Sequence, residues 1–312
     1  MTYKNLDGTT PDKTPRDLFK WMIADRVMGR RPRVLPFVTP RRANDGGALR
    51  EASPSLTWIG HATFAMRLAG KLVATDPVWS TRVGPIKRNT EPGVAFEEMP
   101  PLDIVTVSHA HYDHMDMPTL ARIGKRSLFV VPQDNGDVLR AAGIERVVEL
   151  AWWESHVEGD LRITCVPAQH WSMRFPWDRN KRLWGGFVYE SPEGIAYHAG
   201  DTAFSEKVFR AIGDVFHGPR RIDWAMMPIG AYDPTWFMAS QHIGPEDAGR
   251  ALELMGARTL VAMHWGTFKL TDEPLGEPPE RMRAWWSDRG LDAERLWVLA
   301  IGETRPLARD RA

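Results

Sequence analysis

Residues 105–116 read VTVSHAHYDHMD and place three histidines and two aspartates within eight positions, directly behind an apolar run. A continuous apolar run such as IVTVS (104–108) is typical of a strand that is buried on both faces. Imidazole and carboxylate are ligands that zinc and similar divalent ions accept in open catalytic sites. Residues two apart in an extended segment point the same way, and a turn redirects the next pair. We therefore interpret HxHxDH as a loop that supplies two neighbouring metal positions.

Three more candidate ligands follow other predicted strands. His170 comes after LRITCVPA, Asp201 comes after GIAYHAG, and His264 lies near the end of TLVAMHW. Polar residues at strand ends commonly form sites on the loops that follow. A carboxylate such as Asp201 can bridge two metal ions about 3.5–4 Å apart, the spacing of two-metal hydrolytic sites. A metal-binding module without catalysis is disfavoured, because no expected ligand is missing.

The apolar pattern predicts an α/β fold. Short strand-like runs begin at residue 55, and helical patterns lie between some of them, at 205–216, 244–256 and 278–290. The apolar face predicted for the first helix comprises Val208, Phe209, Ile212, Val215 and Phe216. A long apolar pattern, RLWVLAIGE, predicts a strand near the end of the sequence. Interspersed helices and strands without a linker predict one domain with layered sheets over residues 51–312.

Residues 1–50 have a different texture and form a separate predicted unit. A short helix is predicted over residues 15–29. An extended arm rich in proline, arginine and glycine follows it, and this arm either wraps the body or orders at an interface.

Composition narrows the class of protein. The 40 lysines and arginines match the 40 aspartates and glutamates, so we expect no nucleic-acid partner. The single cysteine, Cys165, excludes an intramolecular disulfide and is compatible with a reducing cytoplasm. No stretch resembles the apolar core of a signal peptide, and none approaches the roughly 18 apolar residues of a spanning helix. We expect a cytoplasmic or peripheral membrane protein.

The order HxHxDH, His170, Asp201 and His264 resembles the metallo-β-lactamase superfamily, which implies a four-layered αββα sandwich. Longer segments resemble the N-acyl-phosphatidylethanolamine-hydrolysing phospholipase D family within it. They include PIGAYDPTWFM (228–238), QHIGPEDA (241–248) and MHWGTFKL (263–270). This resemblance spans about residues 55–305.

The resemblance implies a ligand set for two zinc ions. One ion would be held by His109, His111 and His170, the other by Asp113, His114 and His264, with Asp201 bridging them. It also implies that His242 lies near the substrate phosphate, so Asp113, Asp201 and His242 are the expected catalytic residues. Manganese and iron accept the same ligands.

Other residues are expected to surround this site. Asp76 should support it by bonding a ligand histidine or a loop amide. His61 either does the same or caps a turn, and Tyr232 either lines the pocket or bonds its hydroxyl to the backbone. The loop at 170–180 either touches a membrane interface or packs as a lid or dimer contact. Its side chains of interest are Trp171, Met173, Phe175, Trp177, Arg174 and Arg179.

The implied reaction is phosphodiester hydrolysis of the phospholipase D type on N-acyl-phosphatidylethanolamine-like lipids. In this hypothesis two metal ions lower the pKa of a bridging water, and the resulting metal-bound hydroxide attacks phosphorus. The alternative is a metal-dependent, lactonase-like hydrolase of a soluble substrate, because GHATF and TDP also resemble sugar-lactonase-like members. The resemblance further implies a homodimer, with the N-terminal arm as a candidate contact.

Overall fold

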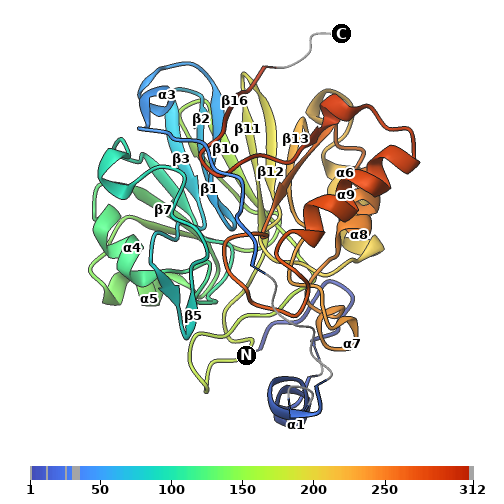
Figure 1. Cartoon of the computed structure of the whole chain (residues 1–312). Coiled ribbons are helices and arrows are strands. Elements are labelled where there is room, and N and C mark those ends of the chain that lie inside the picture. The colour runs from blue at the N-terminus through green and yellow to red at the C-terminus, as the bar shows by residue number, and fades with distance from the viewer. Residues whose placement is uncertain (1, 12, 25–26, 30–35, 309–312) are drawn as a thin grey trace.

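The computed structural model describes residues 2–11, 13–24, 27–29 and 36–308. Two seven-stranded sheets lie at its centre, and helices cover the outer face of each sheet (Figure 1). Side chains from both sheets form one core, in which Trp58 and Phe64 of the first sheet join Phe187 and Tyr197 of the second. The predicted four-layered αββα sandwich is therefore confirmed.

The first sheet has the strand order β16-β1-β2-β3-β6-β7-β8. Its strands are β1 (Ser55–Gly60), β2 (Thr63–Leu68), β3 (Lys71–Thr75), β6 (Ile104–Thr106), β7 (Leu128–Pro132), β8 (Val147–Leu150) and β16 (Thr304–Pro306). The pairs from β3 to β8 are parallel. Helices α4 (Met117–Ile123) and α5 (Gly136–Ala141) cover the outer face of this sheet (Figure 1). Parallel pairing explains why the sequence of β6 and β7 is apolar without alternation.

The second sheet has the order β15-β14-β13-β12-β11-β10-β9. Its strands are β9 (Ser155–Glu158), β10 (Leu161–Val166), β11 (Gly186–Ser191), β12 (Gly194–His198), β13 (Trp224–Pro228), β14 (Thr259–Met263) and β15 (Leu296–Trp297). Helices α6 (Glu206–Val215), α8 (Pro245–Met255) and α9 (Glu277–Asp288) cover its outer face (Figure 1). The short elements are α1 (Pro15–Phe19), η1 (Lys20–Ala24), α3 (Gly47–Arg50), β4 (Arg82–Val83), β5 (Ile86–Lys87), η2 (Phe96–Glu98), η3 (Gly218–Arg220), α7 (Thr235–Met238) and η4 (Ala293–Arg295).

The helices begin and end close to where the sequence predicts. Ser205 caps α6 by accepting a hydrogen bond from the Val208 amide, and Gly256 ends α8 in the left-handed conformation with φ of 64°. The predicted apolar face of α6 is wrong at Val215, whose side chain is 40% exposed. Val215 lines a surface groove together with Trp153, whereas Ile212 and Phe216 at the same end of the helix are buried in the core.

The strand predicted from RLWVLAIGE is too long. Only Leu296 and Trp297 pair with β14 in the second sheet. The chain then crosses to the first sheet, where Ile301 forms a bridge with Arg41 and β16 pairs with β1. A segment that changes sheets cannot continue the ladder of the sheet it leaves.

The described part of the N-terminal arm packs against the body. The Thr39 hydroxyl donates to the Gly266 carbonyl oxygen at 2.6 Å, and the Asn44 amide donates to the Gly302 carbonyl oxygen at 2.7 Å. The predicted helix is present as α1 and the π-helical turn η1. Residues 25–26 of that helix and 30–35 of the arm lie outside the described residues. The division of the chain at residue 50 stays a prediction.

Within the described ranges, none of the helices combines the length and the apolar character that a bilayer-crossing segment requires.

Candidate metal centre

The candidate ligands come from separate segments and meet at one place. The HxHxDH loop follows β6, His170 follows β10, Asp201 follows β12, and His264 follows β14. His61 lies in the turn between β1 and β2. Each sheet therefore contributes ligands, and the site lies where the two sheets meet.

One cluster consists of His109, His111, His170 and Asp201, and each offers a ligand atom within 4.8 Å of the others. His111 Nδ1 lies 2.8 Å from His109 Nε2 and 3.3 Å from His170 Nε2. The three histidines predicted to hold one ion are thus together.

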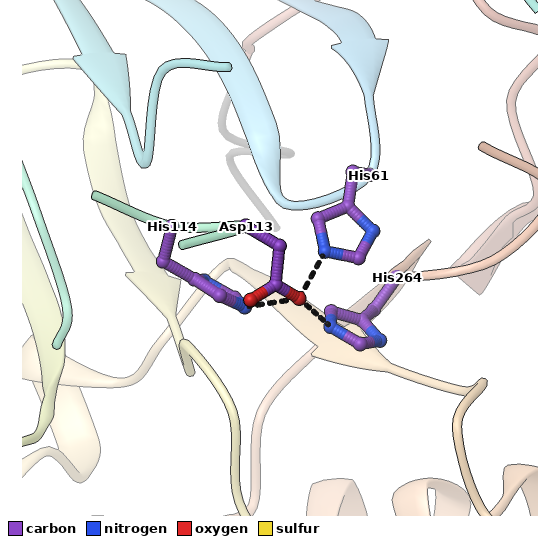
Figure 2. A group of neighbouring side chains, drawn as sticks. All are labelled: His61, Asp113, His114 and His264. Carbon is purple, nitrogen blue, oxygen red and sulfur yellow. Dashed lines mark hydrogen bonds and ion pairs between the residues drawn. The ribbon is translucent and has the colours of Figure 1, made fainter. Parts of the chain in front are cut away.

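The other cluster consists of His61, Asp113, His114 and His264 (Figure 2). The Asp113 carboxylate lies among the three rings: its Oδ2 is 3.0 Å from His61 Nε2 and 3.8 Å from His264 Nε2. The ligands predicted for a second ion are therefore also together.

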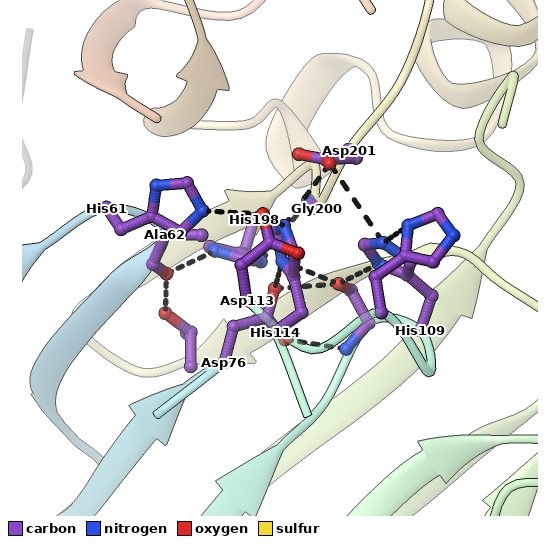
Figure 3. A network of polar contacts seen from close by, with 12 residues as sticks. His61, Ala62, Asp76, His109, Asp113, His114, His198, Gly200 and Asp201 are labelled. Carbon is purple, nitrogen blue, oxygen red and sulfur yellow. Dashed lines mark hydrogen bonds and ion pairs between the residues drawn. The ribbon is translucent and has the colours of Figure 1, made fainter. Parts of the chain in front are cut away.

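Asp201 lies between the clusters, as a bridging carboxylate requires. Its Oδ2 is 3.2 Å from His114 Nε2 and 4.0 Å from His109 Nε2. Its Oδ1 is 3.0 Å from His264 Nε2. The carboxylate thus reaches members of both groups (Figure 3).

His61 belongs to the second cluster, although the sequence left its role open. Its backbone has φ of 56°, in the left-handed region that favours glycine. The turn is held because the His61 amide donates to Thr267 Oγ1 at 2.7 Å, and its carbonyl oxygen accepts from the His264 amide at 3.1 Å. The available signal was a histidine directly after the strand WIG, which resembles the other ligand positions.

Hydrogen bonds behind the rings fix their orientation. Asp76 Oδ2 accepts from His114 Nδ1 at 2.7 Å, and Asp76 Oδ1 accepts from the Ser108 amide at 2.6 Å (Figure 3). His170 Nδ1 donates to the Gln241 carbonyl oxygen at 2.7 Å. In both rings Nε2 is left to face the cluster. Asp76 therefore has the supporting contacts expected of it, whereas Gln241 has no signal in the sequence.

The electrostatics keep the imidazoles of His109, His111 and His170 neutral and the Asp201 carboxylate ionised. Burial lowers the pKa of His109 and His170 well below the usual value, and it lowers the pKa of His111 to about 4. Burial raises the pKa of Asp201, but the neighbouring His114 and His264 outweigh it and hold the pKa well below its usual range.

His114 and His264 differ from the buried histidines of the other cluster. Burial lowers the pKa of His114, but the Asp201, Asp113 and Asp76 carboxylates outweigh burial and hold the pKa well above its usual value. Burial also lowers the pKa of His264, but the Asp201 and Asp113 carboxylates outweigh burial and raise the pKa to about 9. A bound cation would replace this proton, since metal ligands must be deprotonated.

Several buried polar atoms of the two clusters lack a hydrogen-bond partner among the described residues and are placed as metal ligands would be. His114 Nε2, His264 Nε2 and Asp201 Oδ1 make no hydrogen bond of acceptable geometry within the described part of the chain. Buried polar groups seldom stay unpaired. Imidazole nitrogen with carboxylate oxygen is a donor set that divalent transition ions accept. The residues therefore fit a metal centre of two adjacent positions.

His242 lies beside both clusters. Its Nδ1 is 3.8 Å from Asp201 Oδ2, and its ring is 5.4 Å from that of His170. It lines a cavity of about 440 Å³ together with Tyr232. Tyr232 thus lines the pocket, and its hydroxyl donates to Glu277 Oε1 at 2.7 Å instead of to the backbone.

The loop at 170–180 is partly exposed. Trp177 is 70% exposed, and its ring stacks on that of Phe175 at 5.2 Å. Arg174 fits the packed alternative for this loop, because its guanidinium is buried and donates to the Met115 carbonyl oxygen at 2.7 Å. Arg174 thus ties this loop to the HxHxDH loop.

Comparisons with known proteins agree with this geometry. The family profile described as "Beta-lactamase superfamily domain" matches residues 72–265. An uncharacterized protein of Mycobacterium tuberculosis is 40% identical over 299 residues, which cover 90% of this chain and 77% of that protein. N-acyl-phosphatidylethanolamine-hydrolyzing phospholipase D 1 of Caenorhabditis elegans is 39% identical over 246 residues, covering 73% and 68%. A solved metallo hydrolase of Ignicoccus hospitalis has a TM-score of 0.62 at 24% identity, covering 81% of this chain and 97% of its own.

Proposed function

The chain belongs to the metallo-β-lactamase superfamily, and on this premise we propose that it is a phosphodiester hydrolase of the phospholipase D type. Its proposed substrates are N-acyl-phosphatidylethanolamine-like lipids. The coarser assignment, a metal-dependent hydrolase, follows from the family. The observation that carries the finer one is His242, which lies 3.8 Å from Asp201 beside two ligand clusters. The similarity to the nematode phospholipase D supports the same choice.

The two clusters are the proposed holders of two metal ions. His109, His111 and His170 would bind one, Asp113, His114 and His264 the other, and Asp201 both. When bound, such ions lower the pKa of a water to near neutrality and offset charge on a phosphoryl oxygen. Zinc suits these donors, and manganese or iron would accept them too.

The protein groups have separate proposed roles. The pKa of Asp113 is raised by burial, but His114, His264 and His61 outweigh burial and hold it well below the usual range. The carboxylate is therefore ionised at neutral pH and can accept a hydrogen bond from the attacking water.

Burial lowers the pKa of His242 to about 4, so its ring is neutral at pH 7. A neutral imidazole donates one hydrogen bond. This favours orientation of a phosphoryl or leaving-group oxygen over charge neutralisation.

The test is a hydrolysis screen of phosphodiesters, including N-acylated phospholipids, with identification of the products. We expect release of phosphatidic acid, as in a phospholipase D cut. In His242→Ala, activity should fall by about 10²–10⁴-fold while bound metal is unchanged. The matched control is His217→Ala, because His217 is exposed and its ring bonds the Asp214 carbonyl oxygen of its own turn. Full activity in His242→Ala would remove the role proposed for this residue.

The second candidate function is hydrolysis of a lactone. The charge on the wall of the 440 Å³ cavity supports this alternative. That wall carries five carboxylates and one guanidinium, namely Asp233, Glu246, Asp247, Glu273, Glu277 and Arg281. Such a wall gives little attraction to an anionic phosphodiester. A lactone panel assayed beside the phosphodiesters decides between the two bonds.

A membrane surface is the proposed partner of one end of the molecule. Phe19 of α1 is 60% exposed, and Ile23 of η1 is 49% exposed. The loop that carries the exposed Trp177 contacts the segment before α1, because Arg179 donates to the Pro11 carbonyl oxygen. Lys20 lies 4.4 Å from the exposed Trp236 ring and adds positive charge. Exposed apolar rings beside cations are typical of interfacial binding.

Co-sedimentation with anionic vesicles tests the membrane contact. The double variant Phe175→Ala, Trp177→Ala should bind vesicles less than the parent protein does. The control is Val157→Ala, since Val157 is exposed on the edge strand β9. Vesicle binding that is unchanged in the double variant would contradict the membrane contact. If light scattering also shows that the parent protein is a dimer and that the double variant is not, this end of the molecule contacts a second copy of the chain.

A further inference from the structure

The first residues of the chain form a tight loop beside a candidate metal ligand. The Asn5 amide donates to the Thr9 carbonyl oxygen at 2.9 Å, and the Gly8 amide donates to the Asn5 carbonyl oxygen at 2.8 Å. Asn5 itself is buried, with 4% of its surface exposed. Residues 3–9 lie outside the stretch that matches the family profile, residues 72–265.

The Asn5 side chain holds the backbone of His170. Its Oδ1 accepts from the His170 amide at 2.9 Å and from Trp184 Nε1 at 3.1 Å. The preceding residue is held as well, because Gln169 Nε2 donates to Asp7 Oδ2 at 3.0 Å. The segment that carries this ligand is thus bonded at two consecutive residues to the N-terminal loop.

A second contact of the N-terminal segment leads to the ring of the same histidine. Trp21 stacks on Phe237 of α7 at 5.0 Å, and both pack with Met238 in a small buried cluster. The Met238 carbonyl oxygen accepts from the Gln241 amide at 2.9 Å. The Gln241 carbonyl oxygen in turn accepts from His170 Nδ1 at 2.7 Å.

We propose that residues 3–11 and 13–24, the N-terminal bracket, position His170 for metal binding, and that Asn5 is the positioning residue. The bracket fixes the backbone of His170 directly through Asn5, and it supports the ring through α7. Without the Asn5 oxygen, the buried His170 amide loses its acceptor, and the segment must move to recover one, whereas Trp184 Nε1 keeps its bond to the Ala168 carbonyl oxygen at 3.0 Å. The inference rests on the proposal that the clusters bind metal.

The test compares metal affinity in three variants of the full chain. Asn5→Leu keeps the branched arrangement of heavy atoms in the side chain but removes the acceptor oxygen. Asn5→Asp keeps an acceptor at the same place. Lys4→Ala is the matched control, because Lys4 is the exposed neighbour of Asn5.

Competition with a chelator gives the affinity for Zn²⁺, and the absorption spectrum of the Co²⁺-loaded protein reports the ligand geometry. For Asn5→Leu we expect about 10- to 100-fold weaker binding of one ion, the effect typical of losing a group that orients a ligand. We also expect an altered Co²⁺ spectrum. Asn5→Asp should restore most of the affinity, and Lys4→Ala should behave as the parent protein does.

The inference would be overturned if Asn5→Leu folds and has the same Zn²⁺ affinity and the same Co²⁺ spectrum as the parent protein. If Asn5→Leu does not fold, Trp21→Ala decides, because it loosens the contact with α7 and leaves Asn5 in place. An unchanged Co²⁺ spectrum in that variant would then contradict the bracket. Failure of the parent protein itself to bind two ions would instead contradict the proposed function.

Discussion

Single hydrogen bonds behind the ligand rings decide which nitrogen each ring presents. Asp76 accepts from Nδ1 of His114, and the Gln241 carbonyl oxygen accepts from Nδ1 of His170. A histidine bonded in this way offers Nε2 with its lone pair toward the cluster. The sequence allowed Asp76 to be predicted because it ends a strand, but Gln241 acts through its backbone, which carries no residue signature.

Replacing Asp76 should therefore weaken metal binding. For Asp76→Ala we expect about 10- to 100-fold lower metal affinity, because His114 loses the partner that orients it. Metal analysis after dialysis against a chelator measures the effect. Asp116→Ala is the matched control, from the loop that carries His114, since the Asp116 carboxylate accepts from Ser80 and Thr119 and belongs to neither cluster. Equal metal loss in both variants would contradict a specific role for Asp76.

Among the elements, the loops that follow the strands are held by carboxylates that bind backbone amides. In the loop at 170–180, Asp178 Oδ1 accepts from the amides of Arg174 and Phe175 at 2.8 Å each. Its Oδ2 accepts from Arg182 Nε at 3.0 Å. The loop could be located from the sequence by its aromatic residues. The inward direction of Arg174 could not, because it depends on free carbonyl groups of another loop.

Asp178 gives this loop a stability that depends on pH. Burial raises the pKa of Asp178, but the hydrogen bonds from Phe175, Arg174 and Arg182 outweigh burial and lower it below the usual value. A group whose pKa is lower in the folded state adds stability above the unfolded pKa, about 4. That stability is lost as the pH falls through the folded pKa.

Asp178→Asn should reduce the free energy of unfolding by about 1–3 kcal/mol at pH 7, the cost of losing hydrogen bonds to a buried charged acceptor. The difference from the parent protein should narrow as the pH falls below about 4. Urea denaturation at several pH values measures it. Asp160→Asn, at an exposed turn position, should show no such difference at pH 7. A difference in the free energy of unfolding that stays constant with pH would contradict the role given to the ionised Asp178 carboxylate.

For the molecule as a whole, the sequence predicted the layers better than their connections. The strands that carry ligands are apolar runs, so their existence and the convergence of His109, Asp201 and His264 could be expected. The sequence only hinted at the membership of His61 through its place after WIG, because that membership depends on a left-handed turn that Thr267 holds from the loop after β14. The crossing from β15 to β16 was also missed, since an apolar pattern does not say which sheet a strand joins.

Because the clusters tie loops of both sheets together, metal removal should destabilise the whole protein. A ligand that binds only the folded state stabilises it by about 2.7 kcal/mol at a concentration 100 times its dissociation constant. We expect the thermal unfolding midpoint to fall with a chelator and to recover with added Zn²⁺. The control is Asp201→Asn, whose midpoint should respond much less to the chelator. An unchanged midpoint in the metal-stripped parent protein would contradict this link.

The bond from the His170 amide to Asn5 also has a consequence for the order of synthesis. The two residues are 165 positions apart. At 5–20 residues per second, the ribosome needs on the order of 10 s to make the intervening chain. During that interval Asn5 lacks its native partner. The cluster of His109, His111, His170 and Asp201 can form only after most of the chain has been synthesised. Metal binding at this cluster is therefore a late event of maturation.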